Sequence, residues 1–346
     1  MTYRPAVRPA CAVLVALVTT FASTAPLWAQ EACRFEAGVP DSGTWLKGNT
    51  HTHTLESDGD SPPETVVRWY RDHDYNFLVL SDHNVFTDPA GLTQLTDSSF
   101  ILIGGEELTS SFEGAPVHVN GLNIPHVLEA QRGRTLLETV QLNVDEVRSV
   151  DGVPHINHPN FGWALSAEVL LEVREHPLLE IYNGHPQVHN VGAIDAPDME
   201  EVWDILLTAD QRIYGIAVDD AHHFQGEFAR HRANPGRGWV AVKAPELAPA
   251  PVMAALEAGH FYASTGVTLE DVVSTPGRLE VRIQPQGNFR YTTEFVGPEG
   301  RILATRGGTS AALDLPADAR GYVRARVTDS GGAMAWVQPV FIGCGG

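Results

Sequence analysis

The chain has 346 residues, of which 43% are hydrophobic and 19% charged, and its formal net charge at pH 7 is -20. This length and composition are typical of a globular protein with room for one large domain and a small one. The negative charge argues against nucleic acid or an anionic membrane as a partner, because both carry negative charge themselves.

Residues 1–29 are predicted to form a secretory signal. Basic residues precede an apolar run from Cys11 to Phe21, and the small residues after it suit cleavage after Ala29, with Ala25 as the alternative. The apolar run is too short for a comfortable membrane span. We therefore expect a secreted or periplasmic protein that is free of the membrane once the signal is removed.

Two cysteines remain after removal of this signal, Cys33 and Cys344. An even pair in an oxidising compartment predicts a disulfide. Here it would tie the N-terminal segment to the C-terminal part of the chain.

Short apolar strands alternate with helices along residues 30–275. The first strand is predicted at residues 45–54, and a helix begins at Pro62-Pro63-Glu64. Further strands are predicted at residues 76–80, 99–104, 153–157, 178–182, 212–218 and 239–243, and further helices at 136–150, 167–175, 199–209 and 251–258. About seven such units, without a glycine-rich dinucleotide fingerprint, favour an α/β fold of the parallel (β/α) barrel type over a doubly wound sheet.

From about Gly277 the pattern changes to an alternation of polar and apolar residues, separated by turns such as Gly297-Pro298-Glu299-Gly300. This alternation is typical of half-buried antiparallel strands. We predict a small, sandwich-like antiparallel β domain over residues 276–346, which covers one side of the barrel.

Two histidines end the first strand. His51 and His53 are two residues apart, so on a strand their side chains point to the same face. The turn sequence Ser57-Asp58-Gly59 then brings the Asp58 carboxylate back toward them. Two imidazoles and a carboxylate suit a divalent metal. Taken alone, the motif is explained equally well by solvated histidines and a turn aspartate.

Later strands end in the same kinds of residue: His83, a glutamate at 106 or 107, His118, His158, an aspartate at 219 or 220, and His222. In a (β/α) barrel the active site is built at the carboxyl ends of the strands, and core histidines or surface charges have no reason to follow that rule. The residues alone do not choose between Glu106 and Glu107 or between Asp219 and Asp220. Together these side chains are enough for two or three metal ions.

The motifs resemble those of the PHP family, the polymerase and histidinol phosphatase metal-dependent hydrolases. His51, His53 and Asp58 match the family's first motif, H-x-H-x4-D, and Ser81-Asp82-His83 matches its second. The remaining matches, in chain order, are Gly105-Glu106-Glu107 followed by His118, then His158-Pro159, and Asp220-Ala221-His222.

The resemblance implies a distorted (β/α)7 barrel that binds two or three divalent ions, Zn, Mn or Fe. It selects Asp220, and it selects Glu107 as the residue that bridges metals. The three implied metal positions are held by His51, His53 and Asp220; by Asp58, His83 and His222; and by His118 and His158. Many family members carry histidine in place of Asp58, so the second position is more anionic here.

The leader, the C-terminal β domain and the segments 236–239 and 261–266 resemble a secreted PHP subgroup that includes hydrolases of aryl carbamates such as carbaryl. The sequence shows neither a Gly-x-Ser-x-Gly elbow nor a cysteine placed as a nucleophile. We therefore expect a hydroxide between two metals to attack a small-molecule substrate at phosphorus or at an acyl carbon.

Three functions remain open: a phosphoesterase, which we favour, an aryl carbamate or ester hydrolase, and a secreted metal- or carbohydrate-binding protein without activity. His185 and Arg237 are candidates for substrate binding, as histidine and arginine near the last motifs. Phe161, Trp163 and Phe224 are candidates for an apolar pocket wall.

Overall fold

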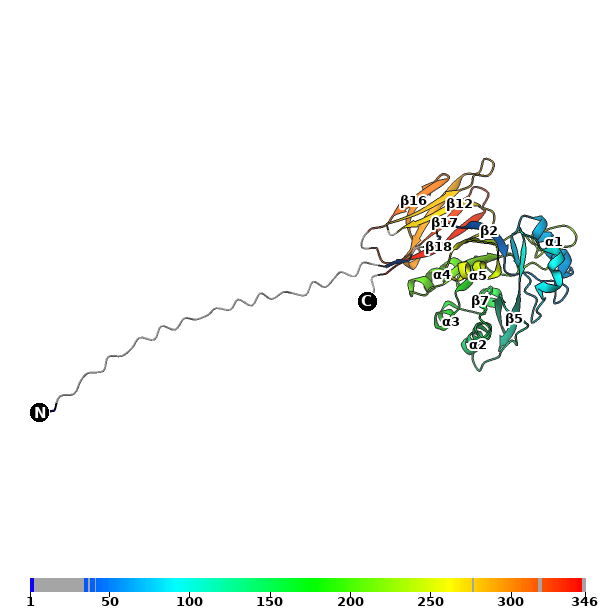
Figure 1. Cartoon of the computed structure of the whole chain (residues 1–346), viewed down its shortest axis with the longest axis horizontal. Helices are drawn as coiled ribbons and strands as arrows, with labels where there is room; N and C mark the ends of the chain where they lie inside the picture. Colours follow the sequence, from blue (N-terminus) through cyan, green and yellow to red (C-terminus); the bar gives the residue numbers. More distant parts are fainter. Residues whose placement is uncertain (3–33, 37, 41, 276, 317–318, 344–346) are drawn as a thin grey trace. The chain divides into compact units, whose positions relative to one another are not determined.

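The structure is a computed structural model that describes residues 1–2, 34–36, 38–40, 42–275, 277–316 and 319–343. All helices and strands below lie in one compact unit that begins at residue 33 (Figure 1). Most of the predicted signal, and both Cys33 and Cys344, lie outside the described residues, so the disulfide stays a prediction. None of the described helices is long and apolar enough to cross a bilayer.

The first half of the chain alternates strands and helices as predicted, with one addition. A hairpin of two eight-residue strands, β5 and β6, follows β4; it was not among the strands predicted by range, although His118 was expected at the end of a strand. The elements are β1 (Arg34–Glu36), β2 (Thr44–Asn49), α1 (Pro63–Asp72), β3 (Phe77–Val79), η1 (Pro89–Leu95), β4 (Ile101–Ile103), β5 (Gly105–Phe112), β6 (Ala115–Leu122), α2 (Leu136–Arg148), β7 (Val153–Ile156) and η2 (Phe161–Trp163).

Local sequence explains the helix limits in this part and the next. A proline and an acidic residue begin α1, while Val66, Val67 and Tyr70 form its buried face. A capping box between Asp198 and Glu201 begins α4. The elements that follow η2 are α3 (Ala167–Glu172), β8 (Leu178–Asn183), α4 (Met199–Thr208), β9 (Tyr214–Val218), β10 (Trp239–Ala244), α5 (Pro249–Glu257) and β11 (Phe261–Ser264).

The C-terminal part is antiparallel β-structure, as its alternating sequence predicted. Its elements are β12 (Leu269–Thr275), β13 (Arg278–Ile283), β14 (Tyr291–Gly297), η3 (Pro298–Gly300), β15 (Arg301–Gly307), β16 (Ser310–Asp314), β17 (Gly321–Asp329) and β18 (Met334–Gly343). Strand β18 pairs with β11, and through β10 it continues into β2, β3 and β4. One sheet therefore runs across the predicted domain boundary near residue 275.

The described strands form three sheets. A ten-stranded sheet has the order β15-β14-β17-β18-β11-β10-β2-β3-β4, with β1 also paired to β18; a second has the order β5-β6-β7-β8-β9, and a third β12-β13-β16. Only β2-β3-β4 and β7-β8-β9 are parallel runs. The prediction of a mixed α/β fold is confirmed, but the closed parallel (β/α)7 barrel is not found among the described strands.

Two isolated parallel bridges link the first two sheets. Thr52 pairs with Ala221, just after β2 and β9, and His83 pairs with Glu107, just after β3 and within β5. Thr52, Ala221 and His83 lie just beyond the carboxyl ends of parallel strands, and Glu107 lies near the start of β5, so among the described residues the two sheets are bridged at this rim. The predicted site residues are concentrated at the same rim.

A shared apolar core lies between these two sheets. It contains buried side chains from both, among them Phe77, Ile103, Leu178 and Ile216, none of which is more than 2% exposed. Gly48 of β2 permits this packing, because a Cβ there would lie 2.1 Å from the Phe77 ring. Burial of this apolar surface is the main term that holds the two sheets together.

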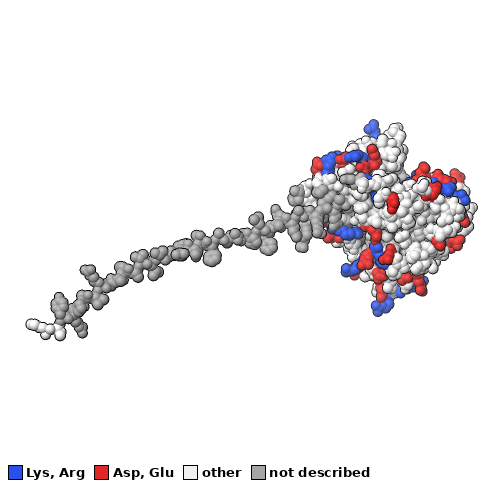
Figure 2. All heavy atoms as spheres, viewed as in Figure 1, with Lys and Arg blue, Asp and Glu red and all other residues white. Residues whose placement is uncertain are grey.

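Charged groups on the visible face are spread over several places, where acidic side chains often lie beside basic ones (Figure 2). Two carboxylates, those of Glu107 and Asp220, are instead buried within a cluster of histidines.

Candidate metal centre

All nine side chains implied as metal ligands lie together at the linked strand ends. They form four overlapping groups in which the ligand atoms are within 4.8 Å of one another, and a fifth group adds His155 and Glu180. The four groups are His53, Asp58, His83 and His222; His51, His158 and Asp220; His51, His53 and Glu107; and His83, Glu107 and His118.

The most buried part of the cluster has the dimensions of a metal cage. His51 Nε2 and His53 Nε2 are 3.1 Å apart, and each lies 3.2–3.4 Å from Glu107 Oε2 and Asp220 Oδ1. Ligands about 2.0–2.1 Å from a tetrahedral Zn²⁺ are about 3.3 Å from one another. These five separations therefore match those between the ligands of a dication of that size.

The His51 ring is oriented by a carboxylate that the motif search did not find. Glu180 of β8 accepts from His51 Nδ1 at 2.6 Å, which places the ring proton on Nδ1 and leaves the Nε2 lone pair facing the cage. Glu180 also accepts from His155 Nε2, the His158 backbone N–H and Asn183 Nδ2 at 2.7–2.9 Å. A carboxylate behind a histidine ligand is a common support of metal sites.

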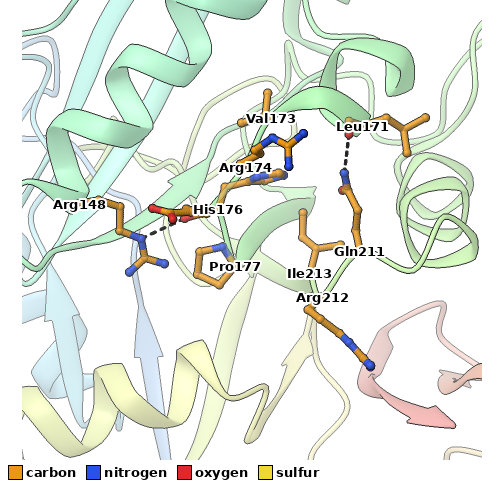
Figure 3. Close-up of a pocket in the computed structure, with 10 residues that line it drawn as sticks. Arg148, Leu171, Val173, Arg174, His176, Pro177, Gln211, Arg212 and Ile213 are labelled. Carbon is orange, nitrogen blue, oxygen red and sulfur yellow. Dashed lines mark hydrogen bonds between the residues drawn. The ribbon is translucent and has the colours of Figure 1, made fainter. Parts of the chain in front are cut away.

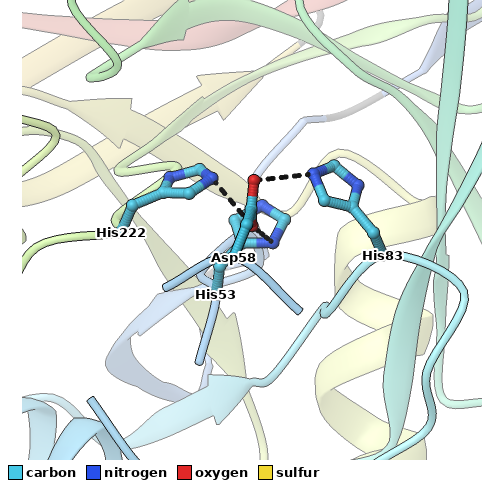
Figure 4. A group of neighbouring side chains, drawn as sticks. All are labelled: His53, Asp58, His83 and His222. Atoms are coloured by element: carbon cyan, nitrogen blue, oxygen red, sulfur yellow. Dashed lines mark ion pairs between the residues drawn. The ribbon is translucent and has the colours of Figure 1, made fainter. Parts of the chain in front are cut away.

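A second group surrounds the carboxylate of Asp58. His222 Nε2 lies 3.3 Å from Asp58 Oδ1 and His83 Nε2 lies 3.6 Å from Oδ2, with His53 on the third side (Figure 4). His222 Nδ1 donates to the Asp220 carbonyl at 2.9 Å, so its Nε2 is the free acceptor. Asp82 fixes the turn before Asp58 by accepting from Ser57 Oγ at 2.6 Å.

Glu107 lies between these groups and a third one. Its Oε2 faces His51 and His53, while its Oε1 is 2.8 Å from His118 Nδ1 and 3.4 Å from His158 Nε2. His118 Nδ1 is buried and, despite this distance, has no hydrogen-bond partner. Two acceptor atoms that approach without a hydrogen bond between them suit a shared cation.

The pKa shifts of the cluster indicate that its carboxylates are stabilised by positive charge beside them. Burial alone would raise the pKa of Glu107, but the imidazoles of His118, His51 and His83 outweigh it and hold that pKa well below its usual range. Burial alone would lower the pKa of His83, but Glu107 and Asp58 raise it to about 10. Without a metal, protons on the histidines balance the carboxylates, and a dication supplies the same balance.

Adjacent acids on the same strands face elsewhere. Glu106 points away from the cluster, where its Oε1 accepts the Leu128 N–H at 2.6 Å. Asp219 accepts the backbone N–H groups of Arg237 and Gly238 and the Tyr70 hydroxyl at 2.6–2.9 Å. The structure thus brings Glu107 and Asp220 into the cluster, the choices implied by the family resemblance.

Two of the cluster residues have strained backbones. His158 and Asp220 have φ angles of 23° and 48°, in the positive-φ region that residues other than glycine adopt only occasionally, histidine and aspartate more often than most. Each costs on the order of 1–3 kcal/mol, which the surroundings must supply. The His158 N–H bond to Glu180 and the Asp220 N–H bond to the His51 carbonyl hold the two residues in place.

A hollow of about 140 Å³ opens above the cluster. Its lining consists of Asp58, His83, Glu107, His118, His158, Phe161, His185, Gln187, Val188, Asp220 and His222. Two of the aromatic residues proposed for its wall lie elsewhere: Trp163 is 45% exposed and stacks on His189, and Phe224 packs near Trp69.

His185 and Arg237 differ in position. His185 lines the hollow, with its ring centre 5.2 Å from that of His222. Arg237 is not part of the lining, because its guanidinium donates to the Gly184 and Ala229 carbonyls at 2.8 and 2.7 Å. Its geometry supports the loops around the site and not a substrate.

A larger hollow, of about 430 Å³, lies at the opposite ends of β8 and β9. Arg148, Arg174, His176 and Arg212 are among its lining residues (Figure 3). It contains none of the nine cluster residues, so it takes no part in the chemistry of the cluster despite its larger volume.

Replacement of Glu180 tests its support of His51. Glu180→Gln keeps the volume but leaves one acceptor oxygen for four donors and turns an amide NH2 toward two of them, and we expect metal affinity to fall roughly 10- to 100-fold. Titration with Zn²⁺ against a competing chelator measures this. Glu106→Gln, an equally buried control outside the cluster, should bind like the wild type; equal affinity of all three proteins would refute the role of Glu180.

Comparisons with known proteins identify a solved structure that shares this fold. No family model and no curated protein matches the sequence. Among solved structures, a two-domain protein from Bacteroides vulgatus ATCC 8482, described as containing a PHP-like metal-dependent phosphoesterase, matches with 16% identity and a TM-score of 0.50, over 88% of this chain and 90% of that chain. This likeness shows a shared fold.

Two shorter solved structures are also similar. An amidohydrolase from Chromobacterium violaceum matches with 14% identity and a TM-score of 0.38, over 54% of this chain and 93% of that chain. A metal-dependent phosphoesterase from Bifidobacterium adolescentis ATCC 15703 matches with 15% identity and the same TM-score, over 56% of this chain and 91% of that chain.

Proposed function

We propose that this protein is a metal-dependent hydrolase that acts on phosphate esters. The observation that carries the proposal is the buried cage of His51, His53, Glu107 and Asp220, whose ligand atoms have the spacing of a metal coordination shell. Histidine nitrogens with carboxylate oxygens suit Zn, Mn or Fe.

The nine residues divide into three positions around Glu107. One is held by His51, His53 and Asp220, a second by Asp58, His83 and His222, and a third by His118 and His158. The two oxygens of Glu107 face the first and the third position, as a bridging carboxylate requires. Two or three divalent ions are the expected content.

Divalent ions bound here supply a lowered pKa for a bound water and polarise the bond to be broken. The chain's own groups do the rest. Glu180 and the Asp220 carbonyl fix the histidine tautomers, and the strained turns at His158 and Asp220 fix the ligand directions before any substrate arrives. Phe161 and Val188 cover part of the hollow and exclude water from it.

An aryl carbamate or ester hydrolase of the same metal type is the second candidate. It is favoured by Phe161 and Val188, apolar side chains in the lining that suit an aryl group. We also propose that the protein is exported, on the basis of the predicted signal at residues 1–29.

Metal analysis combined with a substrate panel tests the proposal. Mature protein produced with Zn, Mn and Fe should contain two or three equivalents of metal and should hydrolyse aryl phosphates. Removal of the metal by a chelator should abolish turnover and re-addition should restore it. Less than one equivalent of metal, or activity that survives complete metal removal, would refute the metal-dependent mechanism.

A further inference from the structure

The hollow above the cluster is lined by histidine imidazoles and lacks the permanently charged side chains of lysine and arginine. Of the eleven lining residues within the described chain, none is lysine or arginine. Sites that bind a phosphate dianion commonly use arginine, because its planar fork pairs with two phosphate oxygens. Here all positive charge at the reacting group has to come from the metals.

Two arginines near the hollow, Arg237 and Arg232, are engaged elsewhere. Arg237 donates to two backbone carbonyls, as described above. Arg232 donates to Asp60 at 3.3 Å and to the Gln225 carbonyl at 2.8 Å. Both guanidinium groups therefore hold the loop after β9 in place.

Negative charge instead stands at the entrance of the hollow. Asp58 is the most exposed of the nine cluster residues, with 55% of its side chain accessible. A substrate that approaches the cluster passes this carboxylate, whose charge offsets part of the charge of the ion proposed for the second position and so leaves less positive charge to attract a dianion.

His185 offers a neutral hydrogen bond in the same hollow. Its Nδ1 accepts the backbone N–H of Gln187 at 3.2 Å, so the ring proton resides on Nε2. Its own backbone N–H donates to Asn183 Oδ1 at 2.8 Å, and Asn183 in turn donates to Glu180 and Asp220. The ring is thus held at the hollow as a fixed donor without a charge.

We propose that the substrate is a phosphodiester, with one negative charge at the reacting group, and that His185 Nε2–H donates to one of its oxygens. This inference rests on the proposed function and narrows it, since a phosphomonoester would bring two negative charges into a hollow that lacks lysine and arginine side chains. The donor suits a monoanion, because it adds no charge of its own.

Three substrates with one chromophore test the proposal on metal-reconstituted protein. They are bis(4-nitrophenyl) phosphate, 4-nitrophenyl phosphate and 4-nitrophenyl N-methylcarbamate. We expect kcat/KM for the diester to exceed that for the monoester at least about tenfold. A ratio of this size corresponds to a modest free-energy cost for the extra negative charge of the monoester. An equal or faster monoester, or a carbamate faster than the diester, would overturn the assignment. Lack of metal-dependent turnover on all three would instead refute the proposed function itself.

Variants at His185 test the donor. His185→Phe keeps an aromatic ring without a donor, and kcat/KM on the diester should fall roughly 10- to 100-fold, as for loss of a hydrogen bond to a charged group. His185→Gln retains an N–H at similar reach and should recover most of the loss, with metal content unchanged in both. His189→Phe on the same loop is the control and should keep wild-type activity. Equal losses of kcat/KM for His185→Phe and His189→Phe would contradict the proposed role of His185.

A variant that adds a positive charge to the hollow gives an independent readout. Gln187 lines the hollow and is exposed, so Gln187→Arg introduces the missing cation with little cost to folding. The monoester-to-diester ratio of kcat/KM should rise at least about fivefold, by the same electrostatic argument. An unchanged ratio would show that charge in the hollow does not set substrate preference.

Discussion

Glu107→Gln is expected to empty one or more metal positions and to lower kcat/KM on the order of 10³-fold or more. The substitution keeps the volume of a side chain that is completely buried, but it removes the negative charge that faces His51, His53, His118 and His158. Dications that share this carboxylate would then repel each other with less compensation. The measurement is metal content by elemental analysis together with turnover after reconstitution.

Glu106→Gln is the matched control for this experiment. Glu106 is adjacent on β5 and equally buried, yet it points to the opposite face, where Oε1 accepts the Leu128 N–H. Burial raises the pKa of Glu106 to about 7, so much of it is protonated at neutral pH and glutamine resembles that form. If Glu106→Gln loses metal while Glu107→Gln stays active, the register of β5 in the site is wrong by one residue.

Arg324→Met is expected to lower the free energy of unfolding by about 3–5 kcal/mol, as for other buried ion pairs that lose one partner. The Arg324 side chain is 2% exposed and makes two hydrogen bonds to Asp204 of α4 at 2.8 and 2.7 Å, and one to Glu200 at 3.0 Å. Without Arg324, the Asp204 carboxylate stays buried without its cation. Because Arg324 lies on β17, the loss also weakens the attachment of the C-terminal strands to α4.

Arg326→Met provides the comparison, two residues further along β17. Arg326 pairs with Glu200 and Glu294, but its side chain is 29% exposed, so solvent screens these pairs and the expected loss is about 1 kcal/mol or less. Urea unfolding of both variants measures the difference. Similar losses for the two would mean that the Arg324 network is not desolvated as the structure describes.

Local patterns predicted most of the elements around the metal centre. Apolar runs such as Phe77–Val79 and Leu178–Asn183 became strands because burial of their side chains requires it, and the proline and acid before Val66 began a helix. Motifs at strand ends named all nine residues that the structure brings together. The motifs converge because strand ends at one rim of a sheet share one location, but the choice of Glu107 over Glu106 and of Asp220 over Asp219 came from the family resemblance.

Glu180 shows what the strand-end rule misses. It lies within an apolar strand and not at its end, so the strand-end pattern does not include it. A signal was present, since a lone carboxylate in a buried run requires partners inside the protein. Its partners, His51 and His155, come from other strands and became visible only when the strands were packed together.

The β5–β6 hairpin was missed for a different reason. In β5, Thr109, Ser110 and Ser111 are small and polar, so no apolar period indicates a strand there, whereas the alternating Val117 and Val119 of β6 do suit one. The backbone N–H and C=O groups of the hairpin are hydrogen-bonded because β5 pairs with β6 and β6 pairs with β7. The pairing with β7 depends on residues far along the chain.

What the sequence determined by itself was the chemistry: the kinds of ligand, their order along the chain and the elements that present them, because these depend on neighbouring residues. The tertiary structure decided the rest. It turned Glu107 and Asp220 into the cluster and Glu106 and Asp219 away from it, and it committed Arg237 to backbone carbonyls. It also joined the strands as open sheets linked by single bridges at one rim instead of a closed barrel. These outcomes depend on which strands pair and in which register, and pairing is settled by long-range burial and hydrogen bonding that no local pattern encodes.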